Sequence, residues 1–589
     1  MTSSNPNVAS WGIGAVVVSA SAAVLANSSD PGGPNLPSST DMDAARFLLQ
    51  ASFGPTDQSI ASVRQLGIAG WIAQQADPAQ TPSPTDFVAW IDRRDAELKA
   101  ADPANRPVAC NRQFEEAFWA SVIADPDQLR QRMAFALSQI MVVSFQGSQI
   151  TPRIAGAYWN VLRQRALGNY FDLLKAVTLS GAMGMYLNIA GNAAADNDPT
   201  RHPDENYARE IMQLMSIGPV QLNLDGSSVL DVRGQPVPTY THDDIVGLAK
   251  VFTGLGWNAA TATARSFYRP IETGADIKPL MPYPQYHSRL SKTFLGKTLP
   301  ALSAVNPSDA ALLAYQTNEL DAALHVIVNH PNVGPFLGRR LIQQFVKSNP
   351  SPDYVRRVAN AFNNNGKGVR GDLLATITAV LTDAEARPST LGTFDGKLRE
   401  PIMRLANWLR AFGATSASKN YIQPYAQDGW LGDPSHGIGQ APLQAATVFN
   451  FWSPDYAPPN TPIAAAGKFA PEFQAVDVLT AAGYANRMLA IIQVGNIGQR
   501  DISTTYKTEQ ALTDSSGLVD PNQLILRINM LLCGGQMGKS LMTRIVNVVN
   551  STSIPAKSLT TTQIAALNLN RVRSTISLTM MSTDYLIQR

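Results

Sequence analysis

The stretch LRQRMAFALSQIMVVS, residues 129–144, decides the fold class of this chain. It is a long and mostly apolar run, so we predict a helix that lies at the centre of the core. Helical periodicity recurs on both sides of this stretch and covers most of the chain. The predicted helices are residues 84–100, 113–124, 151–178, 203–217, 242–255, 308–330, 333–347, 352–364, 370–382, 397–413, 474–495, 520–533, 537–550 and 560–587.

Strand signals are scarce and concentrate in residues 219–240, PVQLNLDGSSVLDVRGQPVPTY. The pairs Asp225-Gly226 and Arg233-Gly234 are typical of hairpin turns between short β-prone runs. Strands do not alternate with helices, and no repeat of fixed period is present. We therefore predict a mainly α fold, a large multi-helix single domain at residues 40–589 with one small β-hairpin excursion at about 219–240.

The charge of the chain argues against nucleic acid as a partner. The 589 residues include 47 Lys and Arg against 45 Asp and Glu, a formal net charge of +2, and no basic run stands out. A nucleic-acid-binding surface needs a basic stripe that neutralises phosphates. Charged residues make up only 16% of the chain, so much of its surface must consist of uncharged polar residues and alanine.

Residues 1–39 are predicted to be a signal-like apolar segment followed by a flexible linker. The segment WGIGAVVVSASAAVLA, residues 11–26, is shorter than the ~20 residues that cross a bilayer and matches the core of a signal peptide. The linker SSDPGGPNLPSS follows at residues 28–39. The first basic residue is Arg46, so the usual positive charge before the apolar segment is missing. We expect export to the periplasm or the extracellular space, without a transmembrane span; the alternative is an apolar tail that targets nothing.

Familiar catalytic motifs are absent or incomplete. CGGQMGKS, residues 533–540, resembles a phosphate-binding loop, but Cys533 stands where the pattern requires glycine, and the preceding NQLILRINMLL is predicted to be a helix. A glycine-rich turn between two helices is the better interpretation. Neither a G-x-S-x-G nucleophile turn nor an H-E-x-x-H zinc motif occurs. We assign no cofactor.

The cysteines and histidines do not predict a metal site either. Cys110 and Cys533 are the only cysteines, so a disulfide framework and a thiolate zinc site are excluded, while a single disulfide and two unpaired thiols both fit the sequence. His202, His242 and His287 lie at the starts of elements or in loops. Their spacing does not show that they converge, so we predict no metal.

The segment HPDENYAREIMQL, residues 202–214, concentrates polar groups on one predicted helix. On a helical wheel, one arc is apolar and comprises Tyr207, Ala208, Ile211, Met212, Leu214 and Met215. The opposite arc is polar and comprises Glu205, Asn206, Arg209, Glu210, Gln213 and Ser216. Such a helix fits three interpretations: the solvent-exposed face of an ordinary amphipathic helix, a buried hydrogen-bond network, or the wall of a cleft.

The next helix supplies the other half of the predicted cleft. It begins within TYTHDDI, where Thr241 and Asp244 form a capping box around His242 and Asp243. If the two helix starts face each other, four titratable side chains line one cleft, and these are the candidate catalytic residues: Glu205, Glu210, His242 and Asp243. The candidate substrate-binding residues are the polar groups of the first helix and three tryptophans that could stack on sugar rings: Asn206, Arg209, Gln213, Trp257, Trp430 and Trp452.

Seven long motifs, in order along the chain, resemble the bacterial family called domain of unknown function 1800. They are DAARFLLQASFGPT, LRQRMAFALSQIMVVS, PDENYAREIMQLMSIG, YTHDDIVGLAKVFTGLGW, HPNVGPFLGRRLIQQFVKSNPSPDYVRRVANAF, KLREPIMRL and FNFWSPDY. The resemblance implies a large, mostly helical protein that is usually exported. It also implies a neighbouring exported protein that resembles sulfatases and alkaline phosphatases. It supplies neither a reaction nor a set of catalytic residues.

Two functions follow as hypotheses. The first is an exported hydrolase that acts on an envelope or extracellular polymer, such as a polysaccharide, through the cleft beside the helix at residues 203–217. The second is a non-catalytic binding or assembly protein whose partner is the exported sulfatase- or phosphatase-like protein. In the second case, the polar helix is a structural network, and the aromatic loop at residues 414–470 belongs to a protein–protein interface.

Overall fold

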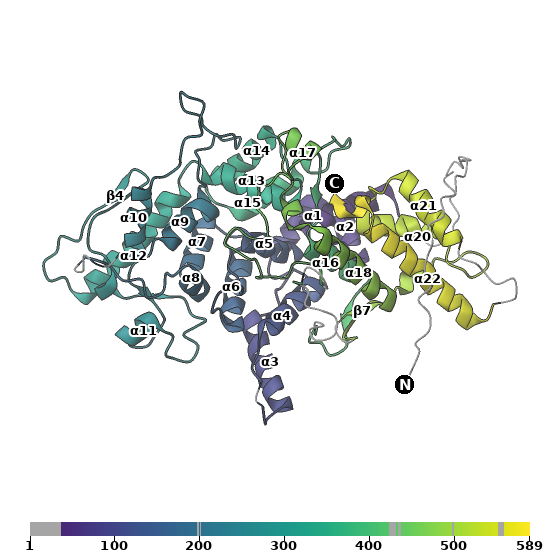
Figure 1. Cartoon of the computed structure of the whole chain (residues 1–589), viewed down its shortest axis with the longest axis horizontal. Coiled ribbons are helices and arrows are strands. Elements are labelled where there is room, and N and C mark those ends of the chain that lie inside the picture. The colour runs from purple at the N-terminus through teal and green to yellow at the C-terminus, as the bar shows by residue number, and fades with distance from the viewer. Residues whose placement is uncertain are drawn as a thin grey trace, which may run out of the picture. The chain divides into compact units, whose positions relative to one another are not determined.

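The fold is mainly α, as predicted (Figure 1). The structure is a computed structural model, and it describes residues 37–105, 107–196, 200, 202–422, 432–433, 437–497, 500–551 and 559–589. The helices of the first half are α1 (Ser39–Ala51), α2 (Asp57–Ala76), α3 (Phe87–Ala101), α4 (Asn111–Ala124), α5 (Gln128–Ser138), α6 (Pro152–Arg165), α7 (Tyr170–Thr178), α8 (Gly181–Tyr186), α9 (Asn206–Glu210), α10 (His242–Val251) and α11 (Ala264–Tyr268).

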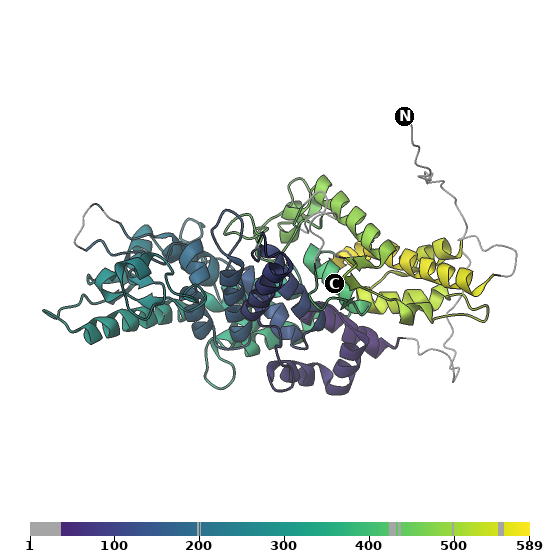
Figure 2. The same cartoon turned by 90° about the horizontal axis from the view of Figure 1, so that it is seen from below.

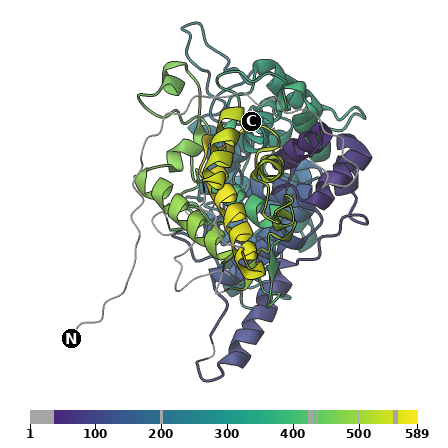
Figure 3. The same cartoon turned by 90° about the vertical axis from the view of Figure 1, so that its right-hand side faces the viewer.

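The helices of the second half include α13, which contributes to the candidate site. They are α12 (Asp309–Val328), α13 (Val333–Phe345), α14 (Pro352–Asn363), α15 (Leu373–Thr382), α16 (Pro401–Ala411), α17 (Pro462–Ala465), α18 (Val478–Val494), α19 (Lys507–Gln510), α20 (Pro521–Ile528), α21 (Lys539–Asn550), α22 (Thr561–Met580) and α23 (Thr583–Leu586). Among them, α18, α20, α21 and α22 pack together, as three directions of view show (Figures 1, 2 and 3).

Helix α5 lies at the centre of the core, as its sequence predicts. Every residue of α5 except Arg130 is buried, and the helix packs against α2, α4, α6 and α13. The prediction of one helix over residues 129–144 is wrong at its end, because α5 stops at Ser138. The residues after it stay buried in a non-helical conformation, and the Ser144 hydroxyl donates to the carbonyl of Ala445 at 2.6 Å. The early end of α5 places Gln139 at the start of a turn.

The predicted β-hairpin excursion at residues 219–240 is present as a small antiparallel meander. The amide of Gln221 donates to the carbonyl of Val237, and the amide of Val229 donates to the carbonyl of Gln221, both at 2.8 Å. Its turns contain Gly226 and Gly234, which have φ values of 78° and 77°, as hairpin turns of this kind require.

Four further small sheets were not predicted from the sequence. They pair β1 (Leu255–Gly256) with β2 (Met281–Pro282), β3 (Lys292–Phe294) with β4 (Lys297–Leu299), β5 (Lys397–Leu398) with β9 (Ile587–Gln588), and β8 (Ile502–Ser503) with both β6 (Thr415–Ser416) and β7 (Asn496–Ile497). All five pairings are antiparallel, and each strand has two or three residues. Strands this short carry too little periodicity to be read from sequence.

The helix predicted at residues 203–217 is α9 followed by a π-helical turn, η1 (Ile211–Ser216). A π turn is wider than an α turn, so it rotates the residues that follow it relative to an α-helical wheel. The wheel therefore misplaces two residues. Ser216, predicted on the polar arc, is fully buried and donates to the carbonyl of Ile211 at 2.5 Å, whereas Leu214, predicted on the apolar arc, is half-buried.

Residues Pro37–Arg589 form one compact unit with a continuous hydrophobic core. The segment at residues 533–540 is a glycine-rich turn between helices, as predicted: Gly534 ends a π turn with a φ of 58°, and α21 begins after Gly538. A Cβ atom at Gly534 would lie 2.8 Å from the Cα atom of Arg46, so the glycine also allows a close approach to α1. None of the helices in the described part of the chain combines the length and apolar character that a membrane span requires.

Candidate functional site

The two predicted helix starts do meet, but they meet at the surface. The carboxylate of Glu205 accepts from the Arg209 guanidinium at 3.3 Å and lies 3.8 Å from Nδ1 of His242. The side chains of Glu205, Arg209 and His242 are 29%, 41% and 70% exposed. Asp243 is exposed in the first turn of α10, and Asn206 is half-buried at the start of α9. These residues form an exposed ion pair beside a histidine.

Glu210 differs from the residues of that group because it is buried. Only 7% of the residue is exposed, and its Oε2 atom has no hydrogen-bond partner. Burial raises the pKa of Glu210, an effect that the charge of Arg209 partly offsets. Of the three interpretations of the polar arc, an exposed helix face therefore does not hold for Glu210, which is buried.

The three tryptophans have different surroundings. Trp257 is 3% exposed and packs so closely against α8 that a Cβ atom at Gly181 would lie 2.9 Å from its ring. It is therefore a core residue that no sugar could reach, contrary to its predicted role. Trp430 lies outside the described residues. Trp452 lines a pocket together with Gln213, so these two predicted binding residues do come together.

The histidines near the polar helix do not converge. His287 is buried in a separate cluster, where Nε2 lies 2.8 Å from the carboxylate of Glu319 and Nδ1 lies 2.8 Å from the carbonyl of Thr253. Lys292 contacts the same carboxylate at 2.7 Å. Among the residues that the structure describes, no three or more His, Cys, Asp or Glu side chains are grouped so that they could hold a metal ion.

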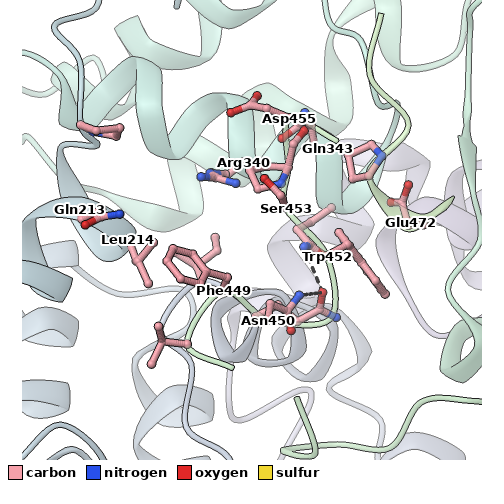
Figure 4. Close-up of a pocket in the computed structure, with 17 residues that line it drawn as sticks. Gln213, Leu214, Arg340, Gln343, Phe449, Asn450, Trp452, Ser453, Asp455 and Glu472 are labelled. Carbon is pink, nitrogen blue, oxygen red and sulfur yellow. Dashed lines mark hydrogen bonds between the residues drawn. The ribbon is translucent and has the colours of Figure 1, made fainter. Parts of the chain in front are cut away.

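A pocket of about 210 Å³ lies where the π turn, α13 and the loop after Val448 meet, and we call it the glutamine pocket (Figure 4). Four glutamines line it, and two of them, Gln343 and Gln344, belong to α13. The lining residues are Gln139, Ile140, Gln213, Leu214, Pro219, Arg340, Gln343, Gln344, Val448, Phe449, Asn450, Trp452, Ser453, Pro454, Asp455, Pro471 and Glu472. The pocket thus combines amides, aromatic rings, a hydroxyl, two carboxylates and a guanidinium.

The amide of Gln139 links the glutamine pocket to charges behind it. Its Oε1 atom accepts from Asn450 at 3.0 Å and from Gln344 at 3.1 Å, and these two bonds are drawn in Figure 4. Its Nε2 atom donates to the carboxylate of Glu400 at 2.6 Å. Because both ends of the amide are engaged, the orientation of Gln139 is fixed.

The charges behind the pocket form a buried cluster of two carboxylates and two cations. The ammonium of Lys397 lies 2.8 Å from Glu472 and 4.0 Å from Glu400, and all three side chains are less than 5% exposed. Arg132 donates to the carbonyl of Gln344 at 2.5 Å and is also buried. Burial lowers the pKa of Arg132 to about 10, so this guanidinium is charged at neutral pH.

Several polar atoms of this cluster have no hydrogen-bond partner within the protein. They are Nε and Nη1 of Arg132, Oε1 of Gln343, Oε1 of Gln344, Oε1 of Glu400 and Oε2 of Glu472. Buried polar groups are normally hydrogen-bonded, so these atoms have capacity left for polar groups of a molecule in the pocket.

The two carboxylates of the glutamine pocket have contrasting surroundings. Glu472 is buried, and burial raises the pKa of Glu472, although the nearby ammonium of Lys397 opposes the shift. Asp455 is 59% exposed and accepts from the guanidinium of Arg339 at 3.0 Å. One pocket therefore holds a buried carboxyl group with a raised pKa, paired with Lys397, and an exposed carboxylate paired with Arg339. Acid–base chemistry with two carboxyl groups uses groups whose pKa values differ in this way.

A second pocket of about 290 Å³ adjoins the first, and we call it the arginine pocket. It contains both Arg339 and Arg340 of α13, and its wall also includes residues of the meander, Phe336 and Phe469. The two pockets share five lining residues, which are Pro219, Arg340, Gln343, Pro454 and Asp455. They therefore form one continuous concave surface.

Sequence reasoning missed most of this site. Arg340, Glu472, Gln139 and Gln343 were not candidates, because neither their burial nor their proximity leaves a mark in local periodicity. A signal did exist: four of the seven motifs that carry the family resemblance supply lining residues, and a fifth, KLREPIMRL, supplies Lys397 and Glu400 behind them. These motifs converge in the fold at the glutamine pocket.

The comparisons with known proteins give one match. A family described as "Protein of unknown function (DUF1800)" matches residues 46–587, nearly the whole chain. No curated protein and no solved structure matches the chain. The function must therefore be argued from the site.

Proposed function

The chain belongs to the DUF1800 family of proteins of unknown function, and from this premise and the site we propose that it is an exported hydrolase acting on an envelope or extracellular polymer. The reaction takes place in the glutamine pocket. The apolar run at residues 11–26 supports the export part of the proposal. The polymer is a polysaccharide, because the pocket combines aromatic faces with many amide groups, the combination that binds sugars.

The observation that carries the proposal is the contrast between Glu472 and Asp455. The buried carboxyl of Glu472, with its raised pKa and its unpartnered Oε2 atom, is suited to donate a proton. The exposed carboxylate of Asp455, held by Arg339, is suited to accept one. Most glycoside hydrolases use two carboxyl groups in different environments as their catalytic groups.

The proposed reaction needs only water as a second substrate. Glu472 donates its proton to the oxygen that leaves as the glycosidic C–O bond breaks. Asp455 accepts a proton from a water molecule, whose oxygen forms the new bond to the same carbon. Exchange with solvent then returns the proton to Glu472 and removes it from Asp455, so that one water is consumed for each bond cleaved.

The remaining groups of the pocket position the chain of sugars. Phe449 is 54% exposed at the pocket and offers a ring face, and Trp452 lies in the wall beside it (Figure 4). Gln213, Asn450 and Ser453 supply amide and hydroxyl groups that bind sugar hydroxyls. Of the residues first predicted as binding groups, Gln213 and Trp452 keep that role in the proposal.

The test is a cleavage assay of the purified chain against a panel of envelope and extracellular polysaccharides and esters, with new reducing ends or acid groups as the readout. Glu472→Gln and Asp455→Asn should each lower kcat/KM by about 10²–10⁴-fold, the usual range for a general acid or base. Asp455 is exposed, so Asp455→Asn is expected to fold normally even if Glu472→Gln does not.

The matched control is Glu509→Gln. Glu509 is buried like Glu472 and pairs with a cation, Arg527, at 2.6 Å, but it does not line the glutamine pocket. This variant should fold and react as the wild-type chain does, apart from lower stability. If Glu472→Gln and Asp455→Asn turn over at the wild-type rate, the assignment of the reaction to this pocket is wrong.

A second candidate function, the binding or assembly protein, is favoured by one observation. The exposed residues of α18 include Val478, Leu479 and Val494, which are 85%, 60% and 56% exposed, and none of the exposed residues of this helix is charged. An apolar helix face of this kind suits contact with another protein. If the wild-type chain cleaves no member of the panel, this function becomes the better proposal.

A further inference from the structure

Arg340 lies at the junction of the two pockets and has no hydrogen-bond partner among the residues that the structure describes. Its neighbour Arg339 pairs with Asp455 at 3.0 Å. The guanidinium of Arg340, in contrast, makes no hydrogen bond and no ion pair with any described residue, and its contact is the ring of Phe336 at 5.0 Å. In the view of Figure 4, it lies between Gln213 and Ser453.

An unpaired guanidinium in a pocket requires an explanation. Burial lowers the pKa of Arg340 to about 10, so the group still carries its charge at neutral pH. The residue is half-buried, and Asp455, whose charge partly offsets the effect of burial, is hydrogen-bonded to Arg339 instead. A partly covered charge is normally placed beside a hydrogen-bond acceptor. The acceptor is absent from the described protein residues, so a ligand is the natural source of it.

The orientation of the two arginines shows which donors a ligand can reach. The guanidinium of Arg340 lies over Phe336 and that of Arg339 lies over Phe469, at 5.0 and 5.3 Å from the ring centres. A guanidinium that stacks on a ring keeps its N–H donors free in its own plane. Arg339 uses its donors on Asp455, whereas those of Arg340 remain free. The planar fork of Arg340 suits a carboxylate or a sulfate ester, each of which presents paired oxygens.

We propose that the arginine pocket is a subsite for an anionic substituent, a carboxylate or a sulfate ester, on the saccharide bound in the glutamine pocket, and that Arg340 binds this substituent. The inference rests on the proposed function in taking the ligand to be a saccharide. The shared lining residues of the two pockets make them neighbouring subsites of one bound chain.

The charges around the arginine pocket agree with this assignment. It is lined by two cations, Arg339 and Arg340, and by one carboxylate, Asp455, so it carries a net positive charge. Asp455 is already neutralised by Arg339. A neutral saccharide would leave Arg340 unpaired, whereas an anionic one would satisfy it. The subsite therefore selects among polymers by charge.

Equilibrium binding to the full chain, measured by titration calorimetry, tests the inference. The probes are three short oligosaccharides of similar length: oligogalacturonate, which carries only carboxylates; a carrageenan oligosaccharide, which carries only sulfate esters; and maltohexaose, which is neutral. We expect at least one anionic probe to bind about ten-fold or more tightly than maltohexaose, with an affinity that falls as NaCl is added.

The variants identify the residue responsible. Arg340→Gln should lose the preference for the anionic probe and bind it about ten-fold or more weakly, and Arg340→Lys should retain part of it, because it keeps the charge but loses the fork. The matched control is Arg356→Gln. Arg356 is 52% exposed on α14, pairs with Asp353 at 2.9 Å and lines neither pocket. This variant should bind all probes as the wild-type chain does.

Each outcome decides the inference. Tighter binding of oligogalacturonate alone assigns a uronate substituent, tighter binding of the carrageenan probe alone assigns a sulfate ester, and tighter binding of both assigns a subsite that accepts either. The inference is overturned if no anionic probe binds more tightly than maltohexaose, or if Arg340→Gln binds the anionic probes as tightly as the wild-type chain.

The two proposals fail in different ways. If an anionic probe binds through Arg340 and the panel shows no cleavage, the hydrolase proposal fails and the anionic subsite stands. If a polymer is cleaved in a Glu472-dependent manner while Arg340→Gln changes neither binding nor cleavage, the hydrolase stands and the subsite is refuted.

Discussion

The side-chain amide of Gln139 donates to the carboxylate of Glu400 over 2.6 Å, and this bond is one of the links between the glutamine pocket and the buried charges. In Gln139→Leu, Glu400 keeps only the amide of Gln440, at 3.0 Å, as a hydrogen-bond donor. We expect the free energy of unfolding to fall by about 1–3 kcal/mol, the cost of a poorly satisfied buried charge. Urea titration followed by tryptophan fluorescence measures the change. The control Gln146→Leu removes a part-buried bond of 2.9 Å from an exposed residue to Gln444 and should cost less, because both partners in this bond are uncharged. Equal losses would contradict the prediction.

The pH dependence of hydrolysis should reflect the burial of Glu472. A general acid works only while it is protonated, and burial raises the pKa of Glu472. The value of kcat/KM should therefore decline as the pH rises through that raised pKa, and the decline should be absent from the residual activity of Glu472→Gln. A pH–rate profile for both chains provides the measurement. A wild-type profile that stays flat on the alkaline side would rule out this acid.

The exposed ion pair of Glu205 should contribute little to stability or turnover. Its carboxylate is 29% exposed and meets Arg209 at 3.3 Å. Pairs of this kind contribute about 0–1 kcal/mol, so Glu205→Gln should unfold within about 1 kcal/mol of the wild-type chain and keep its kcat/KM. If this variant instead loses activity as completely as Glu472→Gln, the catalytic site lies beside α9, where the sequence first suggested it.

Asp125 should make stability fall with increasing pH. Burial, helped by repulsion from Asp127, raises the pKa of Asp125 from 3.8 to about 7. Between these values the folded chain binds the proton more tightly than the unfolded chain, so the free energy of unfolding decreases as the pH rises, by at most about 1.4 kcal/mol per pH unit. Asp125→Asn cannot ionise and should show a smaller slope between pH 5 and 7 in urea titrations. Parallel slopes for the two chains would contradict the raised pKa.

The two cysteines should differ in reactivity, because both are free thiols and only one is accessible. Cys110 is exposed, while Cys533 is 2% exposed and burial raises its thiol pKa to about 12. Iodoacetamide should label Cys110 in the native chain and Cys533 only after unfolding, because the thiolate is the reacting species. Mass spectrometry of the labelled peptides shows the pattern. A disulfide-linked peptide pair would contradict the free thiols and revive the alternative that the sequence left open.

The positions of the helices could be predicted from sequence, but some of their ends could not. Apolar periodicity located α5, yet it did not reveal that the chain leaves the helix after Ser138, because the following residues are equally apolar and equally buried. The capping box of Thr241 and Asp244 was predicted and is present, since capping depends on residues three apart. The π turn at Ile211–Ser216 has no such local signal, and the wheel failed there.

The site depended on contacts that periodicity cannot show. The sequence brought Gln213 and Trp452 to attention, but it favoured Glu205 over Glu472 because the polar residues near Glu205 are adjacent in the chain. Glu472 has no polar cluster around it in sequence; its partners Lys397 and Glu400 come from another motif. Burial by distant segments gives a carboxyl group its altered chemistry, and that information is held in the tertiary structure.

The wide separation of the pocket's walls along the chain has a consequence for biosynthesis. Gln139 and Glu472 stand at opposite ends of the stretch that lines the glutamine pocket, so the pocket closes only after most of the chain has emerged from the ribosome. Contacts between residues so far apart in the chain form slowly and cost conformational entropy, so we expect the pocket to form late in folding. A chain that ends before residue 472 would contain most of the lining residues of the glutamine pocket but would lack Glu472. The glutamine pocket is therefore expected to be complete only in a chain that extends past Glu472.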